Sequence, residues 1–351
     1  MPAFLPRPLL VAAGLMLAAA VPAPAPGDFL RGVVVSCPRW GPVWGSPAMA
    51  RSLEELKALG VDWVAIHPYA WLRKNGEVEF QPARELDFLR RAVELAEAAG
   101  VQLFWKPHLG YWGSFAWRGD IAFGDDEAAW RRFFDSYRAF IVDQARFAQA
   151  AGVQLLAVGV EYDKTAGRES EWRQIIAAVR QVYQGKITYA ANWDSLQRVP
   201  FWDAVDLIGV HAYFPLAEDA NPDRETLWKG WDRHLIRLKD LSTRQGGKRV
   251  LFAEIGYNRS AEAARVPWTR AMDDRPANRE LRRRLFEVAL ERIEAEPAIA
   301  GMFWWKWIPG PDRFDRDFSM KDPEARGALE RYWGGRGGVG PEEARGSSTS
   351  E

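Results

Sequence analysis

Two glutamates stand directly after hydrophobic runs of the chain. Glu161 follows the apolar residues 155–160, and Glu254 follows the apolar residues 250–253. A carboxyl group at the end of a buried strand borders low-dielectric surroundings, which can raise the pKa of one group while another stays ionised. Cleavage of a glycosidic bond uses that difference, because a protonated carboxyl donates to the leaving oxygen while an ionised one attacks or stabilises the anomeric carbon. The alternative for each glutamate alone is a structural ion pair at the rim of the sheet, but the two together favour a glycosidase.

These glutamates belong to a regular alternation of short apolar strands and longer helical patterns, which predicts a parallel sheet. Several helical patterns end at a glycine that can adopt positive φ, for example Gly60, Gly100 and Gly152. The predicted strands cover residues 32–36, 63–67, 102–106, 155–160, 187–191, 207–211, 250–253 and 301–305. The predicted helices include residues 52–59, 83–98, 127–151, 171–183, 224–244 and 278–295. Eight strands predict an α/β fold with a single (β/α)8 TIM barrel. A doubly wound, dinucleotide-binding sheet is the less favoured fold, because the first strand is not followed by the glycine-rich turn of such a sheet.

The C-terminal ends of the predicted strands carry polar and aromatic residues. In a TIM barrel those ends and the following loops line one open mouth, where substrates bind. The candidate substrate-binding residues are His67, Lys106, His108, Asn192, Trp193, His211 and Trp305. The chain has 18 tryptophans, whose flat rings can stack on a pyranose while Nε1–H donates to a hydroxyl. The tryptophans expected near the mouth are Trp71, Trp105, Trp112, Trp193, Trp304, Trp305 and Trp307. Trp305 is the expected sugar platform. The alternative role for a tryptophan is packing in the core, above all for Trp63 and Trp105, which lie within strands.

Three of the four histidines end strands, which raises the alternative of a metal-dependent barrel hydrolase. Such enzymes usually carry a His-x-His pair at the first strand, whereas here that strand ends Val35-Ser36-Cys37. We therefore expect the histidines to hold sugar hydroxyls or to orient a glutamate, and we expect no metal and no cofactor. The sequence also lacks a Gly-x-Ser-x-Gly elbow and a phosphate-binding P-loop.

Charge and the two chain ends limit the remaining possibilities. Lys plus Arg and Asp plus Glu both number 47, so no net positive field favours nucleic acid, and a neutral carbohydrate is the expected partner.

Residues 1–27 place Arg7 before an apolar run, which predicts a signal peptide and export to the bacterial periplasm or exterior, with an uncleaved anchor as the alternative. Residues 334–351 are rich in Gly, Ser and Glu and are predicted to be disordered. Residues 28–333 then form one catalytic domain, expected to act as a monomer, with the single Cys37 as a core residue.

Four strand-end motifs resemble glycoside hydrolase clan A, and more closely its family 113. They are WKPHL at strand three, VGVEYDK at strand four, HAYFP at strand six and FAEIGY at strand seven, and the resemblance extends from Gly32 to about Pro309. The resemblance implies that Glu161 is the general acid/base and Glu254 the nucleophile of a retaining reaction. It also implies that Tyr213 steadies Glu254 and that Trp305 is the platform. The family is associated with endo-acting cleavage of β-1,4-mannan, so an endo-β-1,4-mannanase is the specific expectation.

One position departs from the clan pattern. Many clan members have Asn immediately before the acid/base, where it donates to the sugar 2-hydroxyl, whereas this chain has Val160. We expect that contact from another residue, with Asn192, His108 and Lys106 as candidates. The long connections 110–124 and 215–226 are expected to shape the site as an open groove or a closed pocket. The remaining alternatives are a clan relative acting on another β-glycan and a non-catalytic carbohydrate-binding barrel of the cell envelope.

Overall fold

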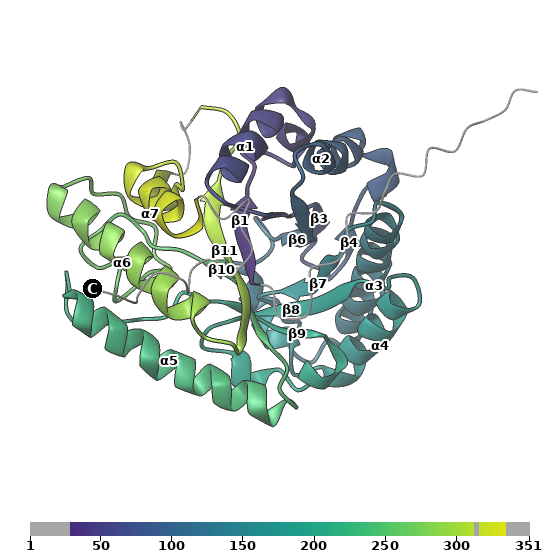
Figure 1. Cartoon of the computed structure of the whole chain (residues 1–351). Helices are drawn as coiled ribbons and strands as arrows, with labels where there is room; N and C mark the ends of the chain where they lie inside the picture. Colours follow the sequence, from purple (N-terminus) through teal and green to yellow (C-terminus); the bar gives the residue numbers. More distant parts are fainter. Residues whose placement is uncertain (1–28, 312–315, 335–351) are drawn as a thin grey trace, which may run out of the picture.

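Eight parallel strands close into a barrel in the order β1-β11-β10-β9-β8-β7-β5-β2 (Figure 1). The computed structural model describes residues 29–311 and 316–334 of the chain. The barrel strands are β1 (Leu30–Val35), β2 (Trp63–Ile66), β5 (Gln102–Trp105), β7 (Leu155–Val160), β8 (Lys186–Asn192), β9 (Leu207–His211), β10 (Val250–Ile255) and β11 (Ile299–Trp307). The first strand pairs with the last, with Leu30 opposite Gly301, and this pairing closes the barrel. The predicted TIM barrel is confirmed, with all eight predicted strands in place.

In the described part of the chain, seven α-helices surround the barrel (Figure 1). They are α1 (Pro47–Ala58), α2 (Asp87–Ala98), α3 (Glu127–Ala150), α4 (Glu169–Arg180), α5 (Arg224–Arg244), α6 (Pro276–Glu294) and α7 (Pro323–Trp333). Helix α1 begins before the predicted Ser52, because Pro47 at its first position is already preorganised for a helix. Helix α2 begins after the predicted Ala83, because Leu86 has non-helical angles (φ −99°, ψ 86°). The prediction had no counterpart of α7.

The barrel interior is filled by a contiguous cluster of apolar side chains. Its buried members are Leu30, Val34, Trp63, Ala65, Phe104, Leu155, Ala157, Val160, Ala190, Leu207, Leu251, Ala253, Ala300 and Phe303. Phe303 reaches across this space and packs against Phe104 with ring centroids 5.0 Å apart. A Cβ at Gly32 would lie only 2.3 Å from the Phe303 ring, so the glycine makes room for this side chain. A larger, separate layer of apolar residues fills the space between the strands and the helices.

Phe303 is therefore expected to contribute strongly to stability. Phe303→Ala removes a fully buried ring from the barrel interior, where rigid strands prevent the cavity from collapsing. We expect the free energy of unfolding to fall by about 3–5 kcal/mol. Urea unfolding followed by tryptophan fluorescence measures the change. Ile236→Ala serves as the control, because Ile236 is 67% exposed and its loss should change stability by no more than about 0.5 kcal/mol.

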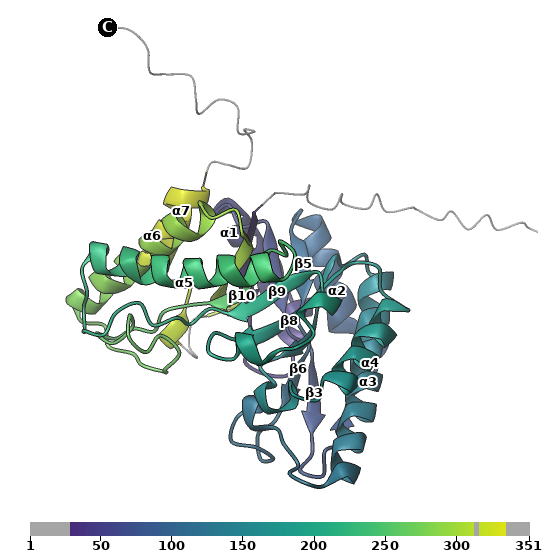
Figure 2. The same cartoon turned by 90° about the horizontal axis from the view of Figure 1, so that it is seen from below.

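A second, three-stranded sheet lies at the C-terminal end of the barrel. It has the order β4-β3-β6, with β3 (Tyr69–Leu72), β4 (Val78–Glu79) and β6 (His108–Gly110). These strands follow β2 and β5, and Figure 2 shows β3 and β6 extending beyond the barrel beside α3. The sequence analysis did not predict this sheet, because its strands are too short to show a period. The sheet forms one wall above the barrel mouth.

The predicted signal peptide (residues 1–27) lies outside the described residues, as does the predicted disordered tail apart from Gly334. Within the described part of the chain, no helix combines the length and apolar character needed to cross a membrane.

Candidate active site

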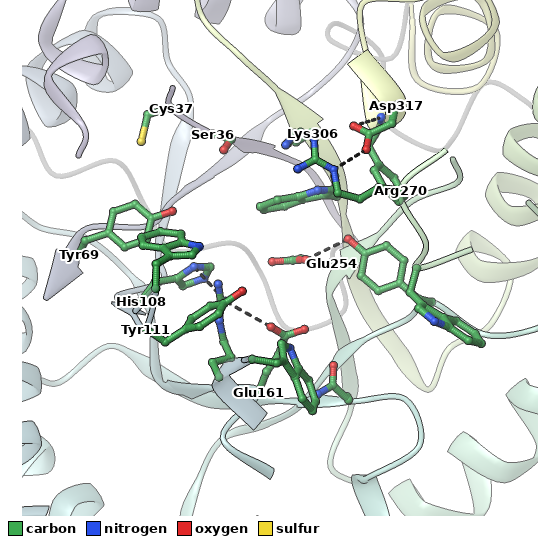
Figure 3. Close-up of a pocket in the computed structure, with 18 of the residues that line it drawn as sticks. Ser36, Cys37, Tyr69, His108, Tyr111, Glu161, Glu254, Arg270, Lys306 and Asp317 are labelled. Atoms are coloured by element: carbon green, nitrogen blue, oxygen red, sulfur yellow. Dashed lines mark hydrogen bonds and ion pairs between the residues drawn. The ribbon is translucent and has the colours of Figure 1, made fainter. Parts of the chain in front are cut away.

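A cavity of 1560 Å³ opens at the C-terminal ends of the barrel strands (Figure 3). Small-molecule pockets usually have about 300–1,000 Å³, so this one has room for a larger ligand. Seven of the ten predicted site residues line it: Glu161, Glu254, Tyr213, His108, Asn192, Trp193 and Trp305. In Figure 3, Glu161 and Glu254 occupy the middle of the view. The barrel therefore brings together two carboxylates that lie 93 positions apart in the sequence.

Irregular strand pairing precedes both glutamates. In β10, Leu251 and Ala253 point into the barrel and Phe252 points outward, so strict alternation would turn Glu254 outward as well. The pairing of β10 with β9 shifts register between Phe252 and Glu254, which turns Glu254 toward the mouth. The pairing of β7 with β8 shifts between Ala157 and Val160, and there it is Val160 that turns into the barrel interior just before Glu161.

Two buried donors contact the carboxyl group of Glu254. The Tyr213 hydroxyl donates to Oε2 at 3.0 Å, and the Lys106 ammonium donates to Oε1. Burial and the negative charge of Glu254 raise the pKa of Tyr213 well above its usual value, so the phenol stays protonated and keeps donating. Lys106 is fully buried, and burial lowers its pKa while Glu254 opposes that effect. Glu254 is thus fixed in position, with a positive charge beside one oxygen.

Glu161 contacts partners through both of its oxygens. His211 Nδ1 lies 2.9 Å from Oε1, and the Arg118 guanidinium lies 3.2 Å from Oε2. Burial alone would raise the pKa of Glu161, but His211 and Arg118 outweigh burial and lower it to about 2. The expectation that burial raises the pKa of one of the two carboxyls is therefore not met at Glu161. Its backbone has a φ of 59°, a conformation uncommon outside glycine and enriched at active sites.

Three predicted substrate-binding residues lie beneath the cavity floor. His67, Lys106 and His211 are fully buried and are not among the residues that line the cavity, so their expected contact with the sugar stays a prediction. His211 instead lies between the carboxylates, with Nε2 3.4 Å from Glu254 Oε1. His67 stacks on His108, with ring centroids 4.8 Å apart. Side chains alternate in direction along a strand, and the sequence alone does not show which of the last residues of a strand face the cavity. His67, Lys106 and His211 pack behind the residues that line it.

A comparison of the sequence with models of protein families agrees with this barrel and its pair of carboxylates. Residues 40–317 match the model of Glycoside Hydrolase Family 113. The chain belongs to glycoside hydrolase family 113. No curated protein matches this family 113 chain in sequence.

Solved structures share the barrel of this family 113 member. A GH113 β-1,4-mannanase aligns with a TM-score of 0.74 at 22% identity, covering 87% of this chain and 99% of its own. A GH113 β-mannanase from Alicyclobacillus acidocaldarius, in complex with ManMIm, aligns with a TM-score of 0.70 at 24% identity, covering 87% and 97%. A family 5 mannosidase from Rhizomucor miehei, in complex with mannosyl-fructose, aligns at 0.57 and 10% identity, covering 87% and 94%. At these identities the likeness demonstrates the shared fold.

Tryptophans of this glycoside hydrolase divide between the cavity and the core. Trp305 lines the cavity, whereas Trp105, Trp304 and Trp307 are fully buried, so the expectation of these three at the mouth is wrong. Alternation along β11 explains the difference, because Trp305 faces the mouth while Trp304 packs outward against Phe286 with centroids 4.7 Å apart.

Two aromatic groups stand on opposite sides of the mouth. One group consists of Trp40, Trp71 and Trp112, with centroid distances of 5.3–6.5 Å. Its three members lie in the segments that follow the neighbouring barrel strands β1, β2 and β5, respectively. The other group is the stacked pair Trp193 and Trp268, with centroids 5.5 Å apart at 28°. This pair follows β8 and β10, on the other half of the barrel.

Several cavity residues were not predicted. They are Ser36, Cys37, Pro38, Arg39, Trp40, Tyr69, Tyr111, Trp117, Arg118, Asp194, Trp268, Arg270, Lys306, Asp317 and Phe318. Most belong to connections, and the length of connection 110–124 was the one signal that pointed to an insertion at the site. Cys37 is half-buried on the cavity wall rather than in the core, because the chain has already left β1. Burial raises the pKa of its thiol to about 12, which keeps it protonated.

A metal would need ligands that this site does not gather. Within residues 29–311 and 316–334, no three His, Cys, Asp or Glu side chains are grouped so as to hold a metal ion. Of the histidines, His108 accepts from Arg118 through Nδ1 at 3.2 Å, and burial lowers its pKa well below the usual value. His108 is therefore a neutral acceptor beside the carboxylates.

Proposed function

We propose that this family 113 glycoside hydrolase cleaves a β-linked polysaccharide with retention of configuration, with Glu161 as general acid/base and Glu254 as nucleophile. The observation that carries the proposal is the pair of glutamates at the ends of the fourth and seventh barrel strands, bridged by His211. Lys106 and Tyr213 contact one oxygen each of Glu254 and fix its orientation, as a nucleophile requires.

The reaction has two displacements. Glu254 attacks the anomeric carbon while Glu161 protonates the leaving oxygen, which gives a covalent glycosyl-enzyme. Glu161 then takes a proton from water, and the oxygen of that water displaces Glu254 from the anomeric carbon. Retaining enzymes place their carboxyls about 5–5.5 Å apart, whereas inverting enzymes need roughly 6.5–9.5 Å. Proton NMR of the first-formed product distinguishes the two, since retention yields the β-anomer before mutarotation.

We propose β-1,4-mannan as the substrate and endo action as the cleavage mode. Solved structures similar in fold include a β-1,4-mannanase and a β-mannanase, which supports the choice of glycan. The open cavity with aromatic groups on both sides supports binding of a chain that extends beyond the cleavage point on each side. Trp305 supplies the platform for the sugar that is cleaved, beside the buried Lys106 at 5.7 Å from its ring centroid.

The test is hydrolysis of β-1,4-mannan, glucomannan, xylan and β-glucans, followed through new reducing ends. Cleavage of mannan into mixed oligosaccharides supports the proposal in full. Cleavage of another glycan alone retains the mechanism and contradicts the substrate. If every glycan stays intact but retards the protein in affinity electrophoresis, the protein is a carbohydrate-binding barrel and the proposed activity is wrong.

Trp268 is expected to bind sugar at a distance from the cleavage point. Its ring is 44% exposed and is stacked on Trp193 at the cavity edge. Trp268→Ala should raise KM for mannan about 2–10-fold with kcat nearly unchanged, because the lost stacking acts on ground and transition states alike. Trp228→Ala is the matched control, since Trp228 is 37% exposed on α5 and does not line the cavity. An unchanged KM for Trp268→Ala across mannan chain lengths contradicts this role.

We further propose that the protein acts outside the cytoplasm. The support is the charged and apolar pattern of residues 1–27, which is typical of a signal peptide. Cell fractionation of the expressed full-length chain, with N-terminal sequencing of the product, tests this proposal.

A further inference from the structure

Both oxygens of Glu161 face nitrogen atoms of neighbouring side chains. Oε1 faces His211 Nδ1 at 2.9 Å, and Oε2 faces the Arg118 guanidinium at 3.2 Å. A guanidinium can only donate and is always charged, so its contact favours the ionised carboxylate. A general acid must instead carry a proton that it can give to the leaving group. Movement of the guanidinium away from Oε2 would therefore favour the protonated form that Glu161 needs as an acid.

The two partners differ in how they are held. His211 belongs to strand β9, is fully buried, and also contacts Glu254, so it is fixed by the barrel. Arg118 belongs instead to the connection after β6 and lines the open cavity. Arg118 is therefore the partner that can leave Glu161.

The segment that carries Arg118 is supported at a few defined points. Asp120 pairs with Lys164 at 2.8 Å, which ties the segment to the turn that follows Glu161. The Arg118 guanidinium lies over the Tyr111 ring at 5.5 Å and donates to His108 at 3.2 Å. When the guanidinium moves away from Glu161, Tyr111 and His108 can still contact it, so the buried positive charge keeps partners.

We propose that Arg118 is a positioning residue that holds Glu161 as a carboxylate in the free enzyme and withdraws from it when a sugar occupies the leaving-group side of the cavity. The proposal rests on the role of Glu161 in the proposed function. Withdrawal frees Oε2, which takes a proton from solvent and passes it to the glycosidic oxygen. Protonation of the acid is thereby coupled to the presence of substrate.

The charged groups around Glu161 come from several elements. Lys106 on β5 and His211 on β9 act together with Arg118 to favour the carboxylate. Two further carboxyl groups lie near Glu161: Glu254 on β10, which His211 also contacts, and Asp163, whose pKa is raised by burial and by the charge of Glu161. Lys106, His211 and Glu254 belong to barrel strands, and Asp163 accepts from Asn192 and Ser195. Arg118 belongs to the connection after β6, so its charge is the one most able to move.

Arg118→Gln tests the coupling through two pH profiles. The profile of kcat/KM reports the free enzyme, and the profile of kcat reports the complex with substrate. We expect the kcat/KM profile of Arg118→Gln on manno-oligosaccharides to move to higher pH by about one unit, because a cation beside Glu161 is lost. The kcat profile should stay within about 0.2 units of the wild type. Arg118→Lys keeps the charge and should restore the wild-type kcat/KM profile.

Two outcomes overturn the proposal. Either the kcat/KM profiles of wild type and Arg118→Gln superimpose, or both the kcat and kcat/KM profiles shift equally. Lys164→Ala provides a second variant that cannot disturb folding, because Lys164 is exposed and outside the cavity. It removes the tie to Asp120 and should move the kcat/KM profile in the same direction by less.

A titration that needs no activity separates this proposal from the proposed function. Protein labelled with 13C at glutamate Cδ gives one carboxyl signal that disappears in Glu161→Gln, which assigns Glu161. In the wild type this signal should keep its carboxylate shift down to about pH 3, and in Arg118→Gln it should titrate at higher pH. Equal titration in both proteins refutes the role of Arg118. Absence of glycan cleavage, with the expected difference in titration, refutes only the proposed function.

Discussion

Glu254→Gln will reduce kcat on mannan by roughly 10⁴–10⁶-fold, the loss seen when an enzyme is deprived of its nucleophile. The amide has the size of the carboxyl but cannot form the glycosyl-enzyme. Its amide oxygen can replace Oε1 and accept from Lys106, and its amide NH2 can replace Oε2 and donate to the Tyr213 oxygen, so both buried contacts keep a partner. Initial rates of reducing-end release, measured at saturating substrate, give the change in kcat.

The matched control is Glu262→Gln, which removes one carboxylate from the connection after β10. Glu262 forms an ion pair with the exposed Arg265, three residues along the chain, and does not line the cavity. Its kcat should stay within about twofold of the wild type. Thermal unfolding of both variants shows whether the barrel is intact. A folded Glu254→Gln enzyme that keeps a tenth of its activity contradicts the nucleophile assignment.

Glu161→Ala will slow mannan cleavage by about 10²–10⁴-fold, because the leaving sugar oxygen then departs without a proton. The loss should be much smaller for an aryl mannoside with an acidic phenol, which leaves as a stable anion. Azide should then restore turnover, since an anionic nucleophile needs no general base in the second step. The product should be the β-mannosyl azide.

This pattern distinguishes the two glutamates. Azide added to Glu254→Ala attacks from the side that the missing carboxylate occupied, so it should give the α-azide. Product analysis by NMR separates the two anomers. If Glu161→Ala loses activity equally on mannan and on the activated aryl mannoside, Glu161 is not the acid. If it gives the α-azide, the two roles are exchanged.

Much of the fold could be read from the sequence. Each barrel strand is buried on both faces, so it appears as a short continuous apolar run. Helix-ending glycines mark several strand starts, and Gly60, Gly100 and Gly152 all have the positive φ expected of them. Helix α7 and the sheet of β3, β4 and β6 were not predicted, because their stability comes from packing on neighbouring elements rather than from a local period.

The sequence by itself determined the barrel and the positions of both carboxylates, because burial and strand spacing are local properties of the chain. It did not determine which strand-end residues reach the cavity. A register shift beside Glu254 turns its side chain toward the mouth, while Lys106 and His211 are fully buried and do not line the cavity. Those outcomes depend on how neighbouring strands pair around the closed barrel. The position of Arg118 depends on tertiary structure even more. Its connection has no hydrophobic period that the sequence could show, and contacts with other parts of the folded barrel bring its guanidinium to Glu161.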